Sequence, residues 1–218
     1  GRTVTTLSAT GQDVFHKNFT PFTEGFLYAE ANNTDEIEKL AVENNCCAIM
    51  FELVQGEGGV CPLTQEFVDG LRCLAEKYGL LLICDEVQTG NGRTGKLYGY
   101  MNYDIMPDVV TTAKGIGGGL PIGLCMLGEK MKDVFTPGTH GSTFGGNPVC
   151  SAGAYSIMSR IDDKLMSEVA EKSAYIKSEL EGAKGVKSVS GMGLMLGIET
   201  ERPAPDIIKE AMERGVLV

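Results

Sequence analysis

Asp85 and Lys114 are the two residues of this 218-residue sequence whose types and positions could do chemistry together. Each follows a segment expected to form a strand, the apolar residues 80–84 before Asp85 and residues 108–112 before Lys114. A lysine at a glycine-lined strand end, where loss of water can lower its pKa, suits Schiff-base formation with a carbonyl group. A carboxylate against a pyridine nitrogen keeps that ring protonated, so the pair predicts pyridoxal phosphate as a cofactor. Either residue taken alone is more often a solvated charge at a strand end.

The elements around these residues predict an α/β fold with a mostly parallel sheet. The apolar run 48–54 is followed by helix-periodic positions from Thr64 to a capping Gly79, and then by the strand 80–84. Strand, helix and strand in this order imply a right-handed crossover between parallel strands, with ligands beyond their carboxyl ends. Further strands are expected at 108–112 and 123–127, and helices at 33–44, 147–160 and 164–180.

The pattern changes near residue 161, where we expect a second, smaller domain to begin. Short strands at 186–189 and 194–199 precede a helix over 205–214. We therefore divide the sequence into part of a large cofactor-binding domain, residues 1–160, and part of a small α+β domain, residues 161–218. The sequence stops in mid-strand at Val218, so a longer parent chain is expected.

The segment from Gly90 to Lys96 has the G-x-x-x-x-G-K spacing of a phosphate loop. That motif needs a hydroxyl residue after the lysine to bind Mg²⁺, and Leu97 has none. The acids here also precede the glycine loop, whereas nucleotide-hydrolysing proteins have the loop first. The run 115–119 lacks the third glycine of the dinucleotide fingerprint because position 120 is leucine. These patterns do not favour a nucleotide site.

Composition argues against several classes of function. The net charge of −10, from 19 Lys and Arg against 29 Asp and Glu, provides no basic footprint for nucleic acid. No apolar run approaches the ~20 residues of a membrane span, and we expect no signal peptide. The seven cysteines are odd in number and contain no C-x-x-C, so we expect buried free thiols, a cytoplasmic location and no metal site. With two histidines, zinc chemistry and a His-relay hydrolase both lack residues.

Four segments in order resemble the class III, or ornithine-type, aminotransferases of pyridoxal-phosphate fold type I. They are Glu52-Leu-Val-Gln-Gly-Glu57-Gly-Gly, Asp85-Glu-Val-Gln88-Thr-Gly-Asn-Gly-Arg-Thr-Gly95, residues 107–123 around Lys114, and His140-Gly-Ser-Thr143-Phe-Gly-Gly-Asn-Pro148. Leu53 replaces the family's usual proline, which affects the shape of that turn and removes no functional side chain. The resemblance covers most of the chain and implies a mostly parallel sheet with helices on both faces.

The resemblance also implies roles in cofactor binding. Lys114 would be the Schiff-base lysine and general acid/base, and Asp85 would pair with the pyridine nitrogen. Gln88 would hydrogen-bond the phenolic oxygen of the ring. Val87 would press on the ring face, although plain packing at a strand end explains this residue equally well.

Further roles concern the substrate and a second subunit. Ser142 and Thr143 would donate to the phosphate of the partner subunit's cofactor, which implies a homodimer with shared active sites. Arg2 would grip a substrate carboxylate. Glu57, with Glu52 nearby, would pair with a switching arginine that lies beyond residue 218.

The implied reaction is ping-pong transfer of an amino group from an amino-acid donor to 2-oxoglutarate. N-acetylornithine is the expected donor, with ornithine and 4-aminobutyrate as alternatives. The resemblance further implies that the family's main phosphate-binding cup, its ring-stacking aromatic residue and its C-terminal end lie outside this chain. The alternative from a different class is a catalytically incompetent fragment or binding subunit on the same scaffold.

Overall fold

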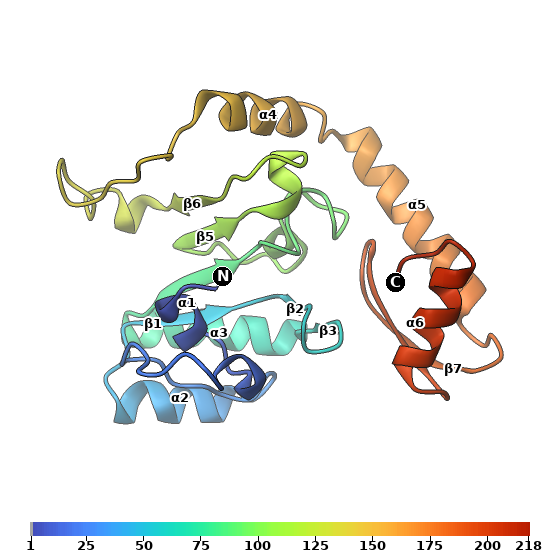
Figure 1. Ribbon diagram of the computed structural model, residues 1–218. Helices are drawn as coiled ribbons and strands as arrows, with labels where there is room; N and C mark the ends of the chain where they lie inside the picture. The colour runs from blue at the N-terminus through green and yellow to red at the C-terminus, as the bar shows by residue number, and fades with distance from the viewer. Residues whose placement is uncertain (1) are drawn as a thin grey trace.

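The computed structural model describes residues 2–218 and is built around a four-stranded sheet with the order β1-β4-β5-β6 (Figure 1). The strands are β1 (Ala48–Phe51), β4 (Leu81–Asp85), β5 (Val109–Thr112) and β6 (Leu124–Leu127). The first three are parallel, whereas β6 runs antiparallel to β5. The predicted mostly parallel sheet is thus confirmed. Asp85 pairs with Thr111, so the ends of β4 and β5 bring Asp85 and Lys114 to one edge.

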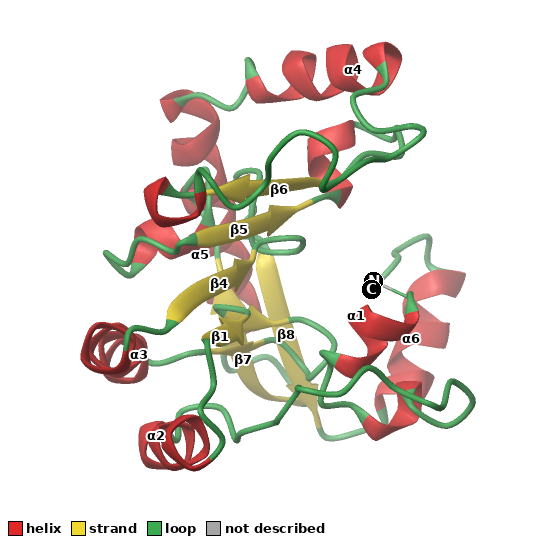
Figure 2. Cartoon of the chain, turned by 90° about the vertical axis from the view of Figure 1, so that its left-hand side faces the viewer, coloured by secondary structure: helices red, strands yellow, loops and turns green. Residues whose placement is uncertain are grey.

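The main helix that covers this sheet is α3 (Gln65–Tyr78), as the apolar spacing predicted. It begins because the Thr64 side chain accepts a hydrogen bond from the Phe67 N–H, and it ends because Gly79 adopts a left-handed conformation with φ of 68°. Its apolar face packs on β1 and β4, and α2 (Thr34–Glu43) packs beside it, contributing to the same core (Figure 2). These layers hold the carboxyl end of β4 in place.

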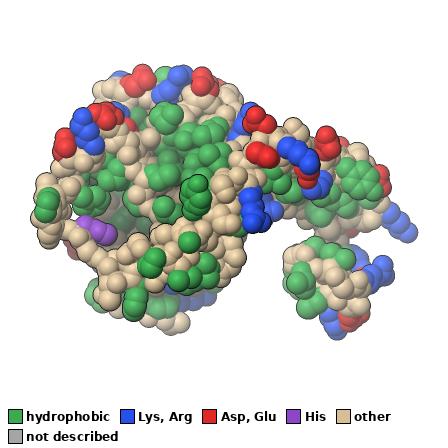
Figure 3. Space-filling model, turned by 90° about the horizontal axis from the view of Figure 1, so that it is seen from above, with side chains coloured by type: hydrophobic (Ala, Val, Ile, Leu, Met, Phe, Trp, Pro, Cys, Tyr) green, Lys and Arg blue, Asp and Glu red, His purple; other side chains and the backbone are tan. Residues whose placement is uncertain are grey.

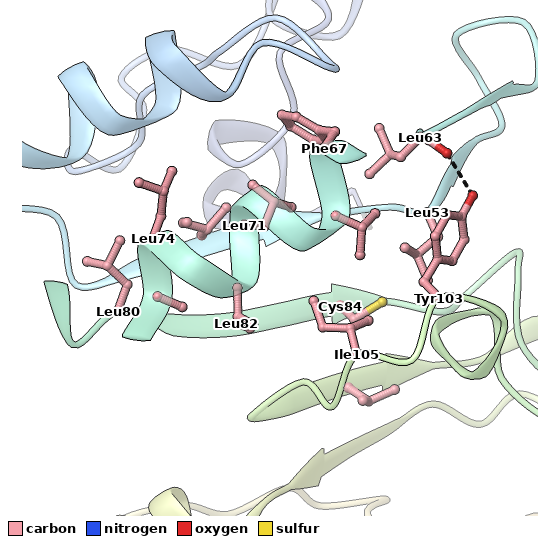
Figure 4. Packing of buried hydrophobic residues seen from close by; sticks show 14 of the residues in the cluster. Leu53, Leu63, Phe67, Leu71, Leu74, Leu80, Leu82, Cys84, Tyr103 and Ile105 are labelled. Carbon is pink, nitrogen blue, oxygen red and sulfur yellow. Dashed lines mark hydrogen bonds between the residues drawn. The ribbon is translucent and has the colours of Figure 1, made fainter. Parts of the chain in front are cut away.

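The core lies between α3 and the sheet (Figure 4). Leu53 and Leu71 are fully buried there, and the Tyr103 hydroxyl donates to the Leu63 carbonyl at 2.8 Å. The apolar run 48–54, predicted as one strand, is broken in the structure. Its first part forms β1, while its end enters β2 (Val54–Gln55), which pairs with β3 (Cys61–Pro62). Burial of Leu53 explains why an apolar residue suits this break.

The second half of the chain crosses the sheet and then returns to it. Helix α4 (Pro148–Met158) leads into α5 (Asp163–Leu180), which descends to the hairpin of β7 (Val186–Met192) and β8 (Met195–Thr200) and to α6 (Ala204–Glu213) (Figure 1). These elements agree with the predicted ones. The Ser190 hydroxyl donates to the Val60 carbonyl at 2.8 Å, and the Leu194 N–H donates to the Arg93 carbonyl at 2.9 Å. The hairpin is therefore docked on the first half, and a domain boundary near residue 160 stays a prediction.

The structure differs from the sequence analysis in one helix and in the burial of the cysteines. The sequence reasoning did not anticipate α1 (Val4–Ser8), in which the side chains of Thr3 and Thr6 cap each other's backbone N–H groups. The cysteines were expected to be buried, but only Cys84 is buried, while Cys47, Cys61, Cys73 and Cys125 are exposed and Cys46 and Cys150 lie between. Alternation along short strands and helix faces turns these small side chains outward.

Within residues 2–218, no helix combines the length and apolar character that a membrane crossing requires. The same residues contain no group of three or more histidine, cysteine or acidic side chains that could hold a metal ion.

Candidate active site

A pocket of about 400 Å³ lies at the carboxyl ends of β4 and β5. Four segments wall it: the turn between β2 and β3, the loop after β4, the turn that starts at Lys114, and the connection between β7 and β8 with the start of β8. Val87, Gln88 and Lys114 all line it, so three of the predicted cofactor residues share one cavity. Its charged lining residues are Lys114 and Arg93, both cations, which favours an anionic ligand.

Lys114 stands on an unusual backbone. Its φ of 48° is in the left-handed region, where a side chain costs about 1 to 2 kcal/mol compared with the ordinary helical conformation. It opens the short 3-10 turn Lys114–Gly117, which packs against α4. A Cβ at Gly118 would lie 2.9 Å from Ile157, so the turn fits closely against that helix. The surrounding packing therefore holds Lys114 at the pocket in a conformation that an isolated turn would avoid.

Asp85 lies at the end of β4, next to the pocket residues. Its carboxylate accepts a hydrogen bond from the Val87 N–H at 2.9 Å, which fixes the first turn of the loop. Gln88 then lies directly over Gly56, where an added Cβ would be only 2.5 Å from the Gln88 side-chain nitrogen. A glycine at position 56 is thus required for Gln88 to reach the pocket wall, and this contact joins two of the motifs.

Glu52 belongs to the same electrostatic neighbourhood. Burial raises the pKa of its carboxyl group, the negative charges of Asp85 and Glu57 raise it further, and the charge of Lys114 opposes them. Glu52 lines a second, more apolar cavity of about 170 Å³ beside β1, not the pocket that contains Lys114. Glu57 is exposed.

Three other predicted residues lie outside the pocket. The Arg2 guanidinium sits over the ring of Phe15, 4.5 Å from its centroid. Ser142 and Thr143 are exposed in a turn where the Gly145 N–H donates to the Ser142 carbonyl. The roles suggested for these residues stay predictions.

Asn91 is a pocket residue that the sequence reasoning missed. Its side-chain N–H group donates to the Thr112 hydroxyl at 3.1 Å and to the Ala113 carbonyl at 3.3 Å, so it ties the loop after β4 to the strand that leads to Lys114. Its Oδ1, and the hydroxyl of Thr111, are buried and accept or donate no hydrogen bond within residues 2–218. The only local signal was the Gly90-Asn-Gly92 turn, which indicates a loop and no partner.

A model of the aminotransferase class-III family matches residues 1–218, and the chain belongs to this family. Two relatives are particularly similar over the whole chain. The acetylornithine aminotransferase of Aquifex aeolicus is 45% identical and that of Haemophilus ducreyi is 43% identical. The chain covers 57% and 56% of these proteins, so it spans about half the length of the curated relatives it matches.

Solved structures agree with this assignment. The ornithine aminotransferase of Toxoplasma gondii has a TM-score of 0.92 at 32% identity, covering all of this chain and 54% of the other. A second structure of that enzyme is described with partial occupancy of PLP at its active site. The N-acetylornithine aminotransferase of Stenotrophomonas maltophilia has a TM-score of 0.80 at 32% identity, covering 89% of this chain and 53% of the other.

Proposed function

We propose that this chain is the part of a pyridoxal-phosphate-dependent aminotransferase that carries the reactive lysine. The observation that carries the proposal is the placement of Asp85 and Lys114 at adjacent strand ends, with Lys114 lining a cationic pocket and Asp85 hydrogen-bonded to the pocket residue Val87. Neither a binding module nor an inert scaffold needs an acid and a primary amine held in this way. Held apart at the ends of paired strands, the two groups can act on opposite parts of one flat ligand.

The residues present fit such a cofactor. The pocket is bordered by an apolar side chain, Val87, suited to a ring face, and by a primary amine suited to an aldehyde. Asn91 in the same wall holds the loop after β4 to the strand that leads to Lys114. When bound, pyridoxal phosphate supplies an electron sink for the negative charge that develops on the substrate carbon.

The chain's own residues then have distinct tasks. Lys114 would hold the aldehyde end through its Nζ until the amino group of the substrate replaces it there. The freed Nζ amine would then move a proton to and from the substrate carbon. The Asp85 carboxylate would hold a proton on the ring nitrogen, because a negative charge stabilises the pyridinium form. Gln88, placed by Gly56, would orient the ring through its amide group. The hairpin residues Leu194–Leu196 would exclude water from one side.

We infer N-acetylornithine as the amino donor and 2-oxoglutarate as the acceptor. The support is that whole-chain relatives from eight organisms, at 40–45% identity, are acetylornithine aminotransferases. Ornithine is the second candidate, supported by the TM-score of 0.92 with the Toxoplasma gondii enzyme. Arg2, Glu52 and Glu57 are the proposed substrate-binding residues, with Arg2 suited to a carboxylate.

A homodimer with shared active sites is part of the proposal. The support is an apolar surface over α4 and the segment before it, seen from above in Figure 3. Phe144 is 83% exposed and Tyr155 is 77% exposed. Exposed aromatic residues within an apolar surface are typical of a protein–protein interface. Thr143, next to Phe144, would then reach the cofactor of the neighbour. We further infer a cytoplasmic location, which suits four exposed free thiols.

Reduction with borohydride in the presence of pyridoxal phosphate tests the central assignment. We expect the cofactor to become covalently attached to Lys114, because this amine is held in the pocket, and peptide mass spectrometry would locate it. Lys132, an exposed lysine outside the pocket, serves as the internal control for unspecific labelling. Labelling of surface lysines with Lys114 left unmodified would overturn the proposal.

A further inference from the structure

We propose that Glu86 is a positioning residue whose buried carboxylate fastens both ends of the loop between β4 and Tyr100, and thereby sets Gln88 and Asn91 at the pocket. This inference rests on the proposed function, because the value of the positioning lies in cofactor binding. The sequence analysis gave Glu86 no role. Its side chain is fully buried, at 0% exposure.

The Glu86 carboxylate accepts a weak hydrogen bond from the Cys84 thiol of β4 at 3.6 Å, and its other contacts come from both ends of the loop. At the start, the Thr89 hydroxyl donates to its Oε2 at 2.5 Å. At the end, the Gly99 N–H donates to Oε2 and the Tyr100 N–H donates to Oε1, each at 2.8 Å. Two of these donors are backbone groups and none is a cation. The carboxylate therefore replaces the water that would otherwise satisfy these N–H groups.

Two glycines leave the space that this arrangement needs. A Cβ at Gly99 would lie 3.2 Å from Oε2 of Glu86 and 3.0 Å from Cβ of Thr89. A Cβ at Gly90 would lie 2.7 Å from the Glu86 carbonyl, which accepts the Gly90 N–H at 3.0 Å. The backbone thus closes tightly around both the main chain and the side chain of Glu86.

The fastened loop carries pocket residues between its two anchors. Gln88 and Asn91 lie inside it, and Asn91 also reaches the strand before Lys114. Neither residue is held by Glu86 directly. Because the anchors at Thr89, Gly99 and Tyr100 set the path of the loop, loss of the carboxylate should move both side chains relative to Lys114 while the sheet stays intact.

The variant Glu86→Gln tests this in the whole chain, since it keeps the shape and turns one acceptor into a donor. We expect amide hydrogen exchange at Gly99 and Tyr100 to become about tenfold faster, and the affinity for pyridoxal phosphate, followed by absorbance, to fall about tenfold, because a backbone N–H loses its acceptor. Tyr103→Phe is the matched control. It removes another buried hydrogen bond, to Leu63, outside this loop, and should leave cofactor affinity within about twofold.

Each outcome decides the proposal. Unchanged exchange at Gly99 and Tyr100, or an equal loss of cofactor affinity in Tyr103→Phe, would overturn it. If Glu86→Gln does not fold, Thr89→Val removes the anchor at the start of the loop and keeps the carboxylate that accepts the Gly99 and Tyr100 N–H groups. It should lower the affinity for pyridoxal phosphate while exchange at Gly99 and Tyr100 stays unchanged, and an unchanged affinity would overturn the proposal. If the unaltered chain takes up no cofactor at Lys114, the proposed function fails. In that case, faster exchange in Glu86→Gln would show only that Glu86 stabilises the structure of the loop.

Discussion

The amine that we propose as reactive, Lys114, lies on a backbone conformation that side chains disfavour. Lys114 has a φ of 48°, and the turn it opens is packed against α4. A side chain in the left-handed region persists where the surrounding structure determines it, and such positions gather at functional sites. A functional role for Lys114 would therefore explain why the chain keeps a strained backbone that lowers its folding stability.

Glu52 gives a prediction at the same scale. Its pKa is raised by burial and by the charge of Asp85, so the folded chain favours the protonated carboxyl group. Stability is therefore lost as pH rises from the unfolded pKa of about 4.3 through the higher folded value. We expect Glu52→Gln to increase the free energy of unfolding at pH 7 and to have little effect at pH 3, measured by urea denaturation.

The control for Glu52 is an exposed glutamate on α5, Glu179, whose replacement by glutamine should change stability little at either pH. If Glu52→Gln raises the free energy of unfolding by as much at pH 3 as at pH 7, ionisation of the Glu52 carboxyl group does not destabilise the folded chain.

The β7–β8 hairpin is the element that connects the two halves of the chain. Its turn meets the loop after β4, where the Leu194 N–H donates to the Arg93 carbonyl, and its residues Leu194–Leu196 line the pocket. The adjoining Gly193 packs directly against the backbone of Arg93 and Thr94. A Cβ there would lie 2.5 Å from the Arg93 carbonyl oxygen and 2.7 Å from Cα of Thr94.

Gly193→Ala should therefore separate the hairpin from the loop. We expect it to lower the free energy of unfolding by about 2 to 4 kcal/mol, from backbone strain and the clash together, and to weaken cofactor binding by opening one wall of the pocket. Denaturant unfolding and a pyridoxal phosphate titration would measure the two effects.

Gly185→Ala provides the comparison, since Gly185 has a φ of 88° and nothing within 4 Å of an added Cβ. It imposes the backbone strain without the clash, so it should cost less stability and leave cofactor binding unchanged. Equal effects of the two alanines would mean that the hairpin does not support the pocket.

At the scale of the whole molecule, the exposed segment before α4 contains both an exposed apolar side chain, Phe144, and a predicted site residue, Thr143. Thr143 lies beside Phe144 in the segment that leads to α4, and all of this segment is exposed. A phosphate dianion needs several N–H and O–H donors, and sharing them between subunits makes cofactor affinity depend on association. The exposed segment and the pocket would then complete each other across a dimer.

Mixing a variant with weakened cofactor binding and a variant without turnover tests this arrangement in the complete enzyme. Thr143→Ala should weaken cofactor binding and spare the fold, because it removes a hydroxyl from an exposed turn and no core volume. Lys114→Ala should abolish turnover. In the mixed dimer, the site with an intact Lys114 receives its Thr143 from the other subunit, so one complete site should form and activity should reappear.

The two variants must be shown to exchange subunits, for instance by native mass spectrometry. With exchange demonstrated, a mixture no more active than its parents would contradict the crossing role of Thr143.

Local features of the sequence predicted the elements and the placement of Asp85 and Lys114 at strand ends. Thr64 and Gly79 set the limits of α3, and Asn147 caps α4, because capping involves side chains and backbone groups only a few positions apart. The parallel sheet and the placement of Asp85 and Lys114 at one edge followed from the strand order. These predictions needed only periodicity and connectivity.

The tertiary structure alone decided which groups meet. The partners of Glu86, the contact of Gln88 with Gly56, and the hairpin wall of the pocket all join positions in separate loops or elements. Exposure of most cysteines and the break in the run 48–54 depended likewise on which neighbours cover each face. The physical reason is that burial and hydrogen-bond partners are set by the path of the chain in space, whereas caps and periodicity are set within a few residues.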